Sequence, residues 1–211
     1  LGVAVLNIGA SHSSLIVFEG GDVLKMAVLP LGSEHITSDI AIGLRTSLDI
    51  AERIKIEYGT ALPQQIVRRE EINLADLGAE KEEIIMRKYV AEIIEARVEE
   101  LMDKVDAELK KIGRSAQLPA GIVLTGGGAK LEGLLEVAKK RLKLPASIGF
   151  SLGLTSVTEK VNDAAFATAI GLVAWGKEYG GGKGITFPGF FKGGGFFGKI
   201  GKKVKNIFKT F

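Results

Sequence analysis

The chain has 211 residues, of which 46% are hydrophobic and 25% charged, a composition typical of a globular protein with one domain or two small ones. It contains no cysteine and two histidines, which excludes disulfides and thiolate chemistry and argues against a zinc site. The net charge of +3 is segregated, because residues 177–211 carry eight lysines and one glutamate; subtracting their +7 leaves −4 for residues 1–176.

The first 30 residues predict a three-stranded antiparallel meander. Apolar runs at 2–6, 15–18 and 23–29 are separated by a polar turn at 7–14 and by the hairpin pair Gly20-Gly21. Small and hydroxyl residues in the polar turn could offer amides and hydroxyls to a phosphate, and these are Gly9, Ala10, Ser11, Ser13 and Ser14. The alternative for this segment is an ordinary hairpin turn.

Helices and short strands follow the meander. Ser33 and Ser47 are predicted to cap helices over 34–44 and 48–58, the second of which should end at Gly59. Residues 65–74 and 82–86 are short strand candidates. A long helix is predicted over 87–112, because apolar residues recur at helical spacing along one face. Its other face is charged, and the simplest interpretation of that face is a solvated surface.

The segment from Gly121 to Leu134 is the most informative, because an apolar strand breaks into three glycines and then a helix. Glycines let the backbone approach a ligand closely, and amides at the start of a helix favour negative or electron-rich groups. Such a junction suits a nucleotide; the alternative is a tight turn without a ligand. A helix over 131–142, a strand over 146–148 and a helix over 164–175, capped by Asp163, complete an α/β body.

Two different segments form the C-terminal end. Residues 177–195 predict a flexible linker, since 180–195 contain eight glycines. Residues 196–211 predict an amphipathic helix: at 100° per residue, seven apolar side chains fall within about 120° of arc, and lysines such as Lys203 fall outside it. The apolar residues are Phe196, Phe197, Ile200, Val204, Ile207, Phe208 and Phe211.

A helix with a Phe-rich face, a lysine face and no acidic residue is typical of segments that lie in the membrane interface. At about 1 kcal/mol per lysine near anionic lipid, its charges could supply roughly 5 kcal/mol. We therefore expect binding to an anionic membrane surface. Two alternatives are a terminal helix docked on the protein's own core and a nucleic-acid-binding arm. A glycine tether suits the first poorly, and phosphates need no apolar face, so we expect no nucleic-acid partner.

Several motifs occur in a fixed order along the chain. After the small-residue hairpin come HITSDIAIGLRT from His35, AERIKIEYG from Ala51, AEIIEARVEEL from Ala91, PAGIVLTGGGA from Pro119 and ATAIGL from Ala167, and the amphipathic segment ends the series. In this order they resemble the C-terminal half of the FtsA family of bacterial cell-division proteins. The resemblance covers essentially the whole chain.

The resemblance implies an α/β fold that is the second lobe of an actin-like (ribonuclease H-like) ATPase, in which two lobes hold ATP and Mg²⁺. Residues 1–30 and 115–176 would form the inner subdomain of this lobe, and residues 31–114 the outer one. The family's first lobe is absent from this sequence. Because the chain begins at Leu1 within an apolar strand, we expect that something N-terminal to it was removed or is encoded elsewhere.

The family's nucleotide contacts can be transferred to matching positions. Gly126, Gly127 and Gly128 would approach the adenosine and its phosphates, while Glu52 and Lys55 would face the ribose and adenine. The hairpin with Gly9, Ser11 and Ser13 would face a phosphate.

The hairpin departs from the family pattern, which typically reads Asp-Ile-Gly-Gly-Gly-Thr-Thr where this chain has Asn7-Ile-Gly-Ala-Ser-His-Ser. Asn7 lacks the negative charge that would hold hydrated Mg²⁺ or orient water. We therefore expect ATP binding with slow or absent hydrolysis, and we assign no catalytic residue and no metal ligand.

The resemblance also implies partners. Arg97 and Glu100 would help receive the C-terminal peptide of the division tubulin FtsZ, and the body would self-associate into actin-like filaments. The resulting hypothesis is an adaptor that anchors FtsZ filaments to the cytoplasmic face of the plasma membrane at the division site. The main rival is an ATP-dependent phosphotransferase or hydrolase of the same clan, such as a sugar kinase, against which Asn7 and the tail argue. A pilus-type actin-like platform protein is a third possibility.

Overall fold

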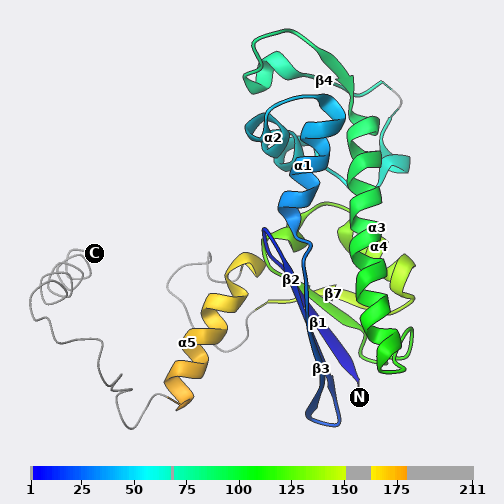
Figure 1. The fold of residues 1–211 in the computed structure, drawn as a ribbon, viewed down its shortest axis with the longest axis vertical. Helices are drawn as coiled ribbons and strands as arrows, with labels where there is room; N and C mark the ends of the chain where they lie inside the picture. Colours follow the sequence, from blue (N-terminus) through cyan, green and yellow to red (C-terminus); the bar gives the residue numbers. More distant parts are fainter. Residues whose placement is uncertain (1, 68, 151–162, 180–211) are drawn as a thin grey trace, which may run out of the picture. The chain divides into compact units, whose positions relative to one another are not determined.

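The computed structural model describes residues 2–67, 69–150 and 163–179 (Figure 1). Contacts along the chain group Leu1–Gly171 into one compact unit and Leu172–Phe211 into a second. Everything that positions the candidate site lies in the first unit. The linker beyond residue 179 and the amphipathic segment 196–211 lie outside the described residues, so those expectations stay predictions.

A five-stranded mixed sheet in the order β3-β2-β1-β6-β7 forms the base of the first unit. The strands β1 (Val3–Ile8), β2 (Ser13–Glu19) and β3 (Asp22–Leu29) are antiparallel, which confirms the meander. Two strands, β6 (Ile122–Thr125) and β7 (Ala146–Ile148), extend the sheet in parallel with β1. Glycine is required at the tip of the β2–β3 hairpin, because Gly20 and Gly21 both have positive φ.

One face of this sheet is packed by helices. Alternate residues of β1, namely Ala4, Leu6 and Ile8, are fully buried, as the period of two in a strand requires. They share one apolar core with buried side chains of α3 (Arg87–Lys111) and α4 (Leu134–Leu142). The apolar stripe predicted for the long helix is confirmed, because its residues are buried or packed against this core.

The segment between β3 and β6 supplies most of the helices. It contains α1 (Ser33–Leu44), α2 (Leu48–Tyr58), the 3₁₀ turn Pro63–Gln65, β4 (Glu71–Asn73), the 3₁₀ turn Leu74–Leu77, β5 (Ile84–Met86) and α3. The strands β4 and β5 pair with each other in a separate two-stranded sheet. Figure 1 shows α1 and α2 beyond the end of the large sheet where β1 and β6 finish. Their assignment to an outer subdomain stays a prediction.

The structure corrects two expectations about local structure. Ser33 is not a cap but the first residue of α1; the cap is Gly32, whose amide donates to His35 Nδ1 at 3.1 Å. The strand expected over 65–74 is confined to Glu71–Asn73, because Pro63 starts a 3₁₀ turn and Leu74 starts another. Ser47 does cap α2, since its hydroxyl accepts from the amide of Ile50 at 3.3 Å.

The glycine-rich junction also differs from the expected continuous helix. Residues Gly127–Lys130 form a 3₁₀ turn, and α4 begins at Leu134 rather than at 131, because Gly133 has φ +79° and interrupts the helix. The last helix, α5 (Ala167–Tyr179), follows a 3₁₀ turn over Ala164–Phe166, so it begins and ends later than the helix expected over 164–175. Asp163 caps this turn as expected, accepting from the amide of Ala165 at 3.0 Å. No helix within the described part of the chain is both long and apolar enough to cross a membrane.

Candidate functional site

The three glycines after β6 have different structural roles. At Gly126, which has φ +87°, a Cβ would lie 2.3 Å from Asn7 Oδ1 and 2.4 Å from the carbonyl oxygen of Ile8. At Gly128 a Cβ would lie 2.4 Å from Ile8 Cγ2, whereas at Gly127 it would meet nothing within 4 Å. Gly126 and Gly128 are therefore required by the close approach to β1, and Gly127 alone opens onto free space.

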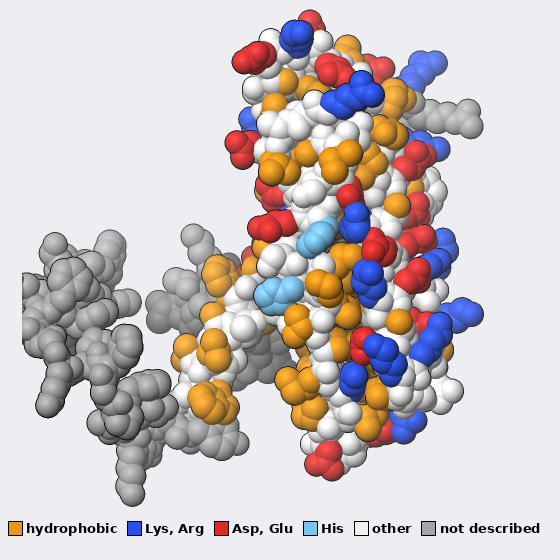
Figure 2. All heavy atoms as spheres, in the orientation of Figure 1, with side chains coloured by type: hydrophobic (Ala, Val, Ile, Leu, Met, Phe, Trp, Pro, Cys, Tyr) orange, Lys and Arg blue, Asp and Glu red, His pale blue; other side chains and the backbone are white. Residues whose placement is uncertain are grey.

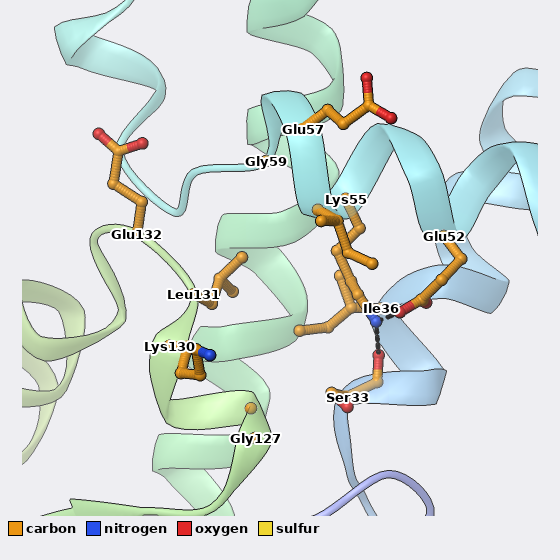
Figure 3. A pocket seen from close by; sticks show the side chains of 12 residues that line it. Ser33, Ile36, Glu52, Lys55, Glu57, Gly59, Gly127, Lys130, Leu131 and Glu132 are labelled. Atoms are coloured by element: carbon orange, nitrogen blue, oxygen red, sulfur yellow. Dashed lines mark hydrogen bonds and ion pairs between the residues drawn. The ribbon is translucent and has the colours of Figure 1, made fainter. Parts of the chain in front are cut away.

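That free space is part of a pocket of about 530 Å³ (Figure 3). Figure 3 shows Gly127, Lys130, Leu131 and Glu132 on one side, with α1 and α2 residues opposite them. Two segments about 70 residues apart in the sequence therefore form its walls. The residues that line it are Ser33, Ile36, Glu52, Lys55, Ile56, Glu57, Gly59, Gly127, Gly128, Lys130, Leu131 and Glu132.

Lys55 is the centre of a polar cluster on the helical wall. Its side chain is only 10% exposed, and its Nζ lies 2.6 Å from Glu52 Oε2. The same ammonium donates to Thr37 Oγ1 at 2.8 Å and to the carbonyl oxygen of Ser33 at 3.3 Å. The Thr37 hydroxyl donates in turn to Glu52 Oε2 at 2.5 Å. These bonds fix Lys55 and Glu52 in place before any ligand arrives, which favours a preorganised site.

The cluster also sets the charge state of Glu52. Partial burial by itself raises the pKa of the carboxyl group, but the hydrogen bonds from Lys55 and Thr37, together with the charge of Lys55, outweigh burial. The pKa of Glu52 is therefore lower than its ordinary value, and at neutral pH the pocket contains a carboxylate beside an ammonium. Because the three donors of the Lys55 ammonium already bond to Glu52, Thr37 and Ser33, the Glu52 carboxylate is the member of the pair that can accept a further hydrogen bond, from the polar edge of a sugar or base.

A backbone connection holds the two walls together. The amide of Ala61 donates to the carbonyl oxygen of Glu132 at 2.8 Å, and Thr60 and Glu132 form an isolated parallel bridge. Gly133 packs against Leu62, the residue after Ala61, since a Cβ at position 133 would lie 2.5 Å from Leu62 Cγ. The chain just after α2 is therefore fixed to the chain just after the glycine turn.

The expected phosphate hairpin lies at the amino end of α1 and is absent from the pocket lining. The amides of Ser33 and Glu34 donate to the carbonyl oxygens of Gly9 and Ala10, both at 2.9 Å, and the amide of Gly9 donates to His12. These contacts satisfy several donors that a phosphate would otherwise use.

The hydroxyls of the hairpin differ in availability. Ser13 is a fully buried strand residue, and its hydroxyl donates to the carbonyl oxygen of Leu31 at 2.7 Å, so its role in the structure is to hold β2 to the chain before α1. Ser11 is exposed, and its hydroxyl lies 3.2 Å from His12 Nδ1. Ser11 is thus the one of the three expected hairpin residues whose polar side chain faces solvent.

The described residues offer no magnesium site of their own. Asn7, at the end of β1, is neutral, and its amide nitrogen donates to Thr168 Oγ1 at 3.2 Å. Within residues 2–67, 69–150 and 163–179, no three His, Asp or Glu side chains are grouped to hold a metal ion. The expected binding of Mg²⁺ by the complete two-lobed protein stays a prediction.

Arg97 and Glu100 lie on α3, away from the pocket lining. The guanidinium of Arg97 makes a bidentate ion pair with Asp39 of α1, at 2.5 and 2.7 Å, and also contacts Glu100. The hydrogen bonds that Arg97 donates to Asp39 outweigh partial burial and raise the pKa of Arg97. Figure 2 shows acidic and basic side chains interleaved along the side of the molecule that α3 occupies. Arg97 thus joins two helices, and a partner's carboxylate would compete with Asp39 for it.

Of the five residues predicted to contact the adenosine and its phosphates, Glu52, Lys55, Gly127 and Gly128 line the pocket, whereas Gly126 does not. Sequence reasoning missed Ser33 and Ile36 of α1, a helix on which no site residue was predicted. It also missed Ile56, which is adjacent to Lys55 on α2, and Lys130 and Glu132, which closely follow the glycines. That proximity was the available signal. The expected membrane-binding residues, from Phe196 to Phe211, lie outside the described residues.

Known structures with similar folds are actin-like proteins. The type IV pilus PilM–PilN complex matches with a TM-score of 0.61 and 23% identity, covering 83% of this chain and 46% of that chain. MreB5 of Spiroplasma citri, solved with AMPPNP bound, matches with a TM-score of 0.62 and 16% identity, covering 97% of this chain and 55% of that one. At these identities the likeness shows the fold, and it confirms the actin-like α/β class.

Sequence comparison adds the family. Cell division protein FtsA of Pseudomonas aeruginosa is 35% identical over 178 residues, covering 84% of this chain and 43% of the relative. Its counterpart in Bacillus subtilis is 36% identical over 179 residues, covering 82% of this chain and 38% of the relative. The chain therefore spans less than half the length of these relatives. The profile of the family "Cell division protein FtsA" matches residues 4–171, and the chain belongs to the FtsA family.

Proposed function

We propose that this chain is the second lobe of an ATP-binding protein that anchors FtsZ filaments to the cytoplasmic face of the membrane at the division site. The observation that carries the proposal is the pocket between the glycine turn and α2 in a chain of the FtsA family. Its opposed walls bring Gly127 together with the Lys55–Glu52 pair, which are the positions the family resemblance assigns to adenosine.

The pocket has the composition that a nucleoside requires. Ile36, Ile56 and Leu131 supply apolar surface for a flat base, and the Glu52 carboxylate, held in place by Lys55, supplies a fixed acceptor for its edge or for the ribose. The open position at Gly127 lets the ligand approach the backbone. An actin-like relative bound to AMPPNP supports the same ligand class for this fold.

Hydrolysis is proposed to be slow or absent. Asn7 stands where the family typically has a carboxylate, and its amide is bonded to Thr168. The protein would then use ATP to control self-association into filaments rather than as a substrate for rapid turnover. The membrane and FtsZ parts of the proposal are supported by family membership and by the amphipathic sequence 196–211.

The direct test is nucleotide binding by a two-lobed FtsA that carries this chain as its second lobe, measured by calorimetry with ATP. Ile56 and Ile42 offer a matched pair, because both are isoleucines on helices and are 72% and 76% exposed, but only Ile56 lines the pocket. We expect Ile56→Glu to abolish binding through repulsion of the phosphates, while Ile42→Glu retains it. Absence of ATP binding by the unmodified protein, or equal binding by both variants, would refute the proposed site.

A further inference from the structure

Arg87 connects three segments that meet at the edge of the pocket. It is the first residue of α3, and its Nε donates to the carbonyl oxygen of Tyr58 at 2.9 Å. Its Nη1 lies 2.6 Å from Glu70 Oε2, and its Nη2 lies 3.9 Å from Glu132 Oε2. One guanidinium thus faces the end of α2, the chain before β4 and the chain after the glycine turn.

The contact with Tyr58 fixes the end of the helix that forms one wall. Tyr58 is the last residue of α2, where carbonyl oxygens have no partner within the helix. Arg87 supplies that partner, and its own amide donates to the carbonyl oxygen of Glu70 at 2.9 Å. Lys55, Ile56 and Gly59 all lie within four residues of Tyr58 and line the pocket. A shift of this helix end would therefore move the polar cluster and the apolar wall together.

The contact with Glu132 reaches the opposite wall. Glu132 lines the pocket and provides the carbonyl oxygen that accepts from Ala61. Its carboxylate is 66% exposed and farther from Arg87 than that of Glu70, so the two contacts differ in strength. The hydrogen bond from Arg87 is the main cause that lowers the pKa of Glu70, which agrees with the close pair. The guanidinium of Arg87 is thus held firmly by Tyr58 and Glu70, and it attracts the carboxylate of Glu132 in the chain after the glycine turn.

We infer that Arg87 is a positioning residue for the pocket, setting the spacing between α2 and the glycine turn through Tyr58 and Glu132. The inference rests on the proposed nucleotide-binding function, although its structural part concerns the junction itself. Arginine suits this role because its planar fork presents several donors in a fixed geometry, whereas lysine offers one flexible ammonium. Arg87→Lys should therefore restore the role only in part.

The first experiment reports on the junction without a ligand. In the two-lobed protein, amide hydrogen exchange is measured at Ala61, whose amide crosses to Glu132. Arg114→Met is the matched control, because Arg114 also makes a close ion pair, with Glu19 at 2.8 Å, but is absent from the pocket lining. We expect Arg87→Met to accelerate exchange at Ala61 about tenfold and Arg114→Met to leave it unchanged. Equal exchange at Ala61 in both variants would overturn the inference.

The second experiment measures ATP affinity in a double-mutant cycle of Arg87→Met and Glu132→Gln. We expect Arg87→Met to raise the Kd about tenfold and Glu132→Gln to raise it less, with no further effect of Glu132→Gln once Arg87 is replaced. A purely structural role predicts that Arg87→Met binds ATP normally at temperatures where it is folded. That result, or additive effects in the cycle, would overturn the inference. If the unmodified protein binds no ATP, the proposed function fails, and the exchange at Ala61 still decides whether Arg87 holds the junction.

Discussion

Gly126 lies so close to Asn7 that a Cβ at position 126 would be 2.3 Å from Asn7 Oδ1. The contact exists because β1 and β6 are parallel neighbours, and Asn7 pairs with Thr125 at the ends of the two strands. The glycine turn is therefore part of the packing between strands as well as part of a pocket. Substitutions at Gly126 and Gly128 should therefore affect the stability of the fold, and a substitution at Gly127 should affect ligand binding.

Gly126→Ala and Gly128→Ala should destabilise the fold, and Gly127→Ala should not. The first two would force a Cβ into the end of β1, and position 126 also needs a positive φ, so we expect a loss of about 2–4 kcal/mol. Gly127→Ala should leave the melting temperature nearly unchanged and weaken ATP binding about tenfold. Thermal unfolding and calorimetry check this prediction. Equal destabilisation by all three substitutions would contradict the assignment of Gly127 to the ligand.

Glu52→Gln should make stability less dependent on acid pH. The pKa of Glu52 is lowered in the folded protein, so its contribution is present above the ordinary value of 4.5 and is lost as the pH falls through the folded-state value. Urea unfolding at a series of acid pH values measures the slope. We expect a shallower slope for Glu52→Gln than for the unmodified protein, after both are referenced to pH 7. Identical slopes would show that the Lys55 and Thr37 contacts do not persist in solution.

Asp39→Asn should strengthen binding of an acidic FtsZ tail peptide, and Arg97→Glu should weaken it. Asp39 occupies the guanidinium of Arg97 in the free protein, so removing its charge releases the cation for a partner. We expect affinity to rise about threefold in the first variant and to fall at least tenfold in the second. Fluorescence anisotropy at two salt concentrations measures both changes. Unchanged affinity in both variants would exclude Arg97 from the FtsZ contact.

Phe208→Glu should release the protein from anionic vesicles, while Asn206→Glu should retain binding. Both substitutions lower the charge of the tail equally, but only Phe208 belongs to the apolar arc of the expected helix. Burial of one Phe supplies about 1.5–3 kcal/mol, so its loss together with a buried carboxylate should shift most of the protein to the unbound fraction. Liposome flotation measures that fraction. Loss of binding in both variants would indicate attraction by charge alone.

The sheet and the long helices could be predicted because their periodicity is strong. The alternation in β1 and the apolar stripe of α3 follow directly from which faces are buried. Caps and short elements were harder. The amide of Gly32 is satisfied by the side chain of His35, and the chain around Pro63 follows packing against α3 rather than its strand propensity.

In the candidate site, too, some features could be predicted from the sequence and others depend on tertiary packing. Glu52 and Lys55 were identified through the family resemblance, but their bonds to Thr37 and Ser33 depend on how α1 crosses α2. Ser13 looked like a phosphate ligand because it is a hydroxyl in a small-residue turn. Its burial and its hydrogen bond to the carbonyl oxygen of Leu31 accompany the extension of β2 into that turn, which the sequence did not indicate.

The difference in free space around Gly126, Gly127 and Gly128 affects what a glycine triplet indicates when related sequences are compared. Two of the three are held by the fit of one strand end against another, so selection for folding alone would preserve them. A descendant that had abandoned its nucleotide would still display a nearly intact triplet, and the change would first be visible at the middle position.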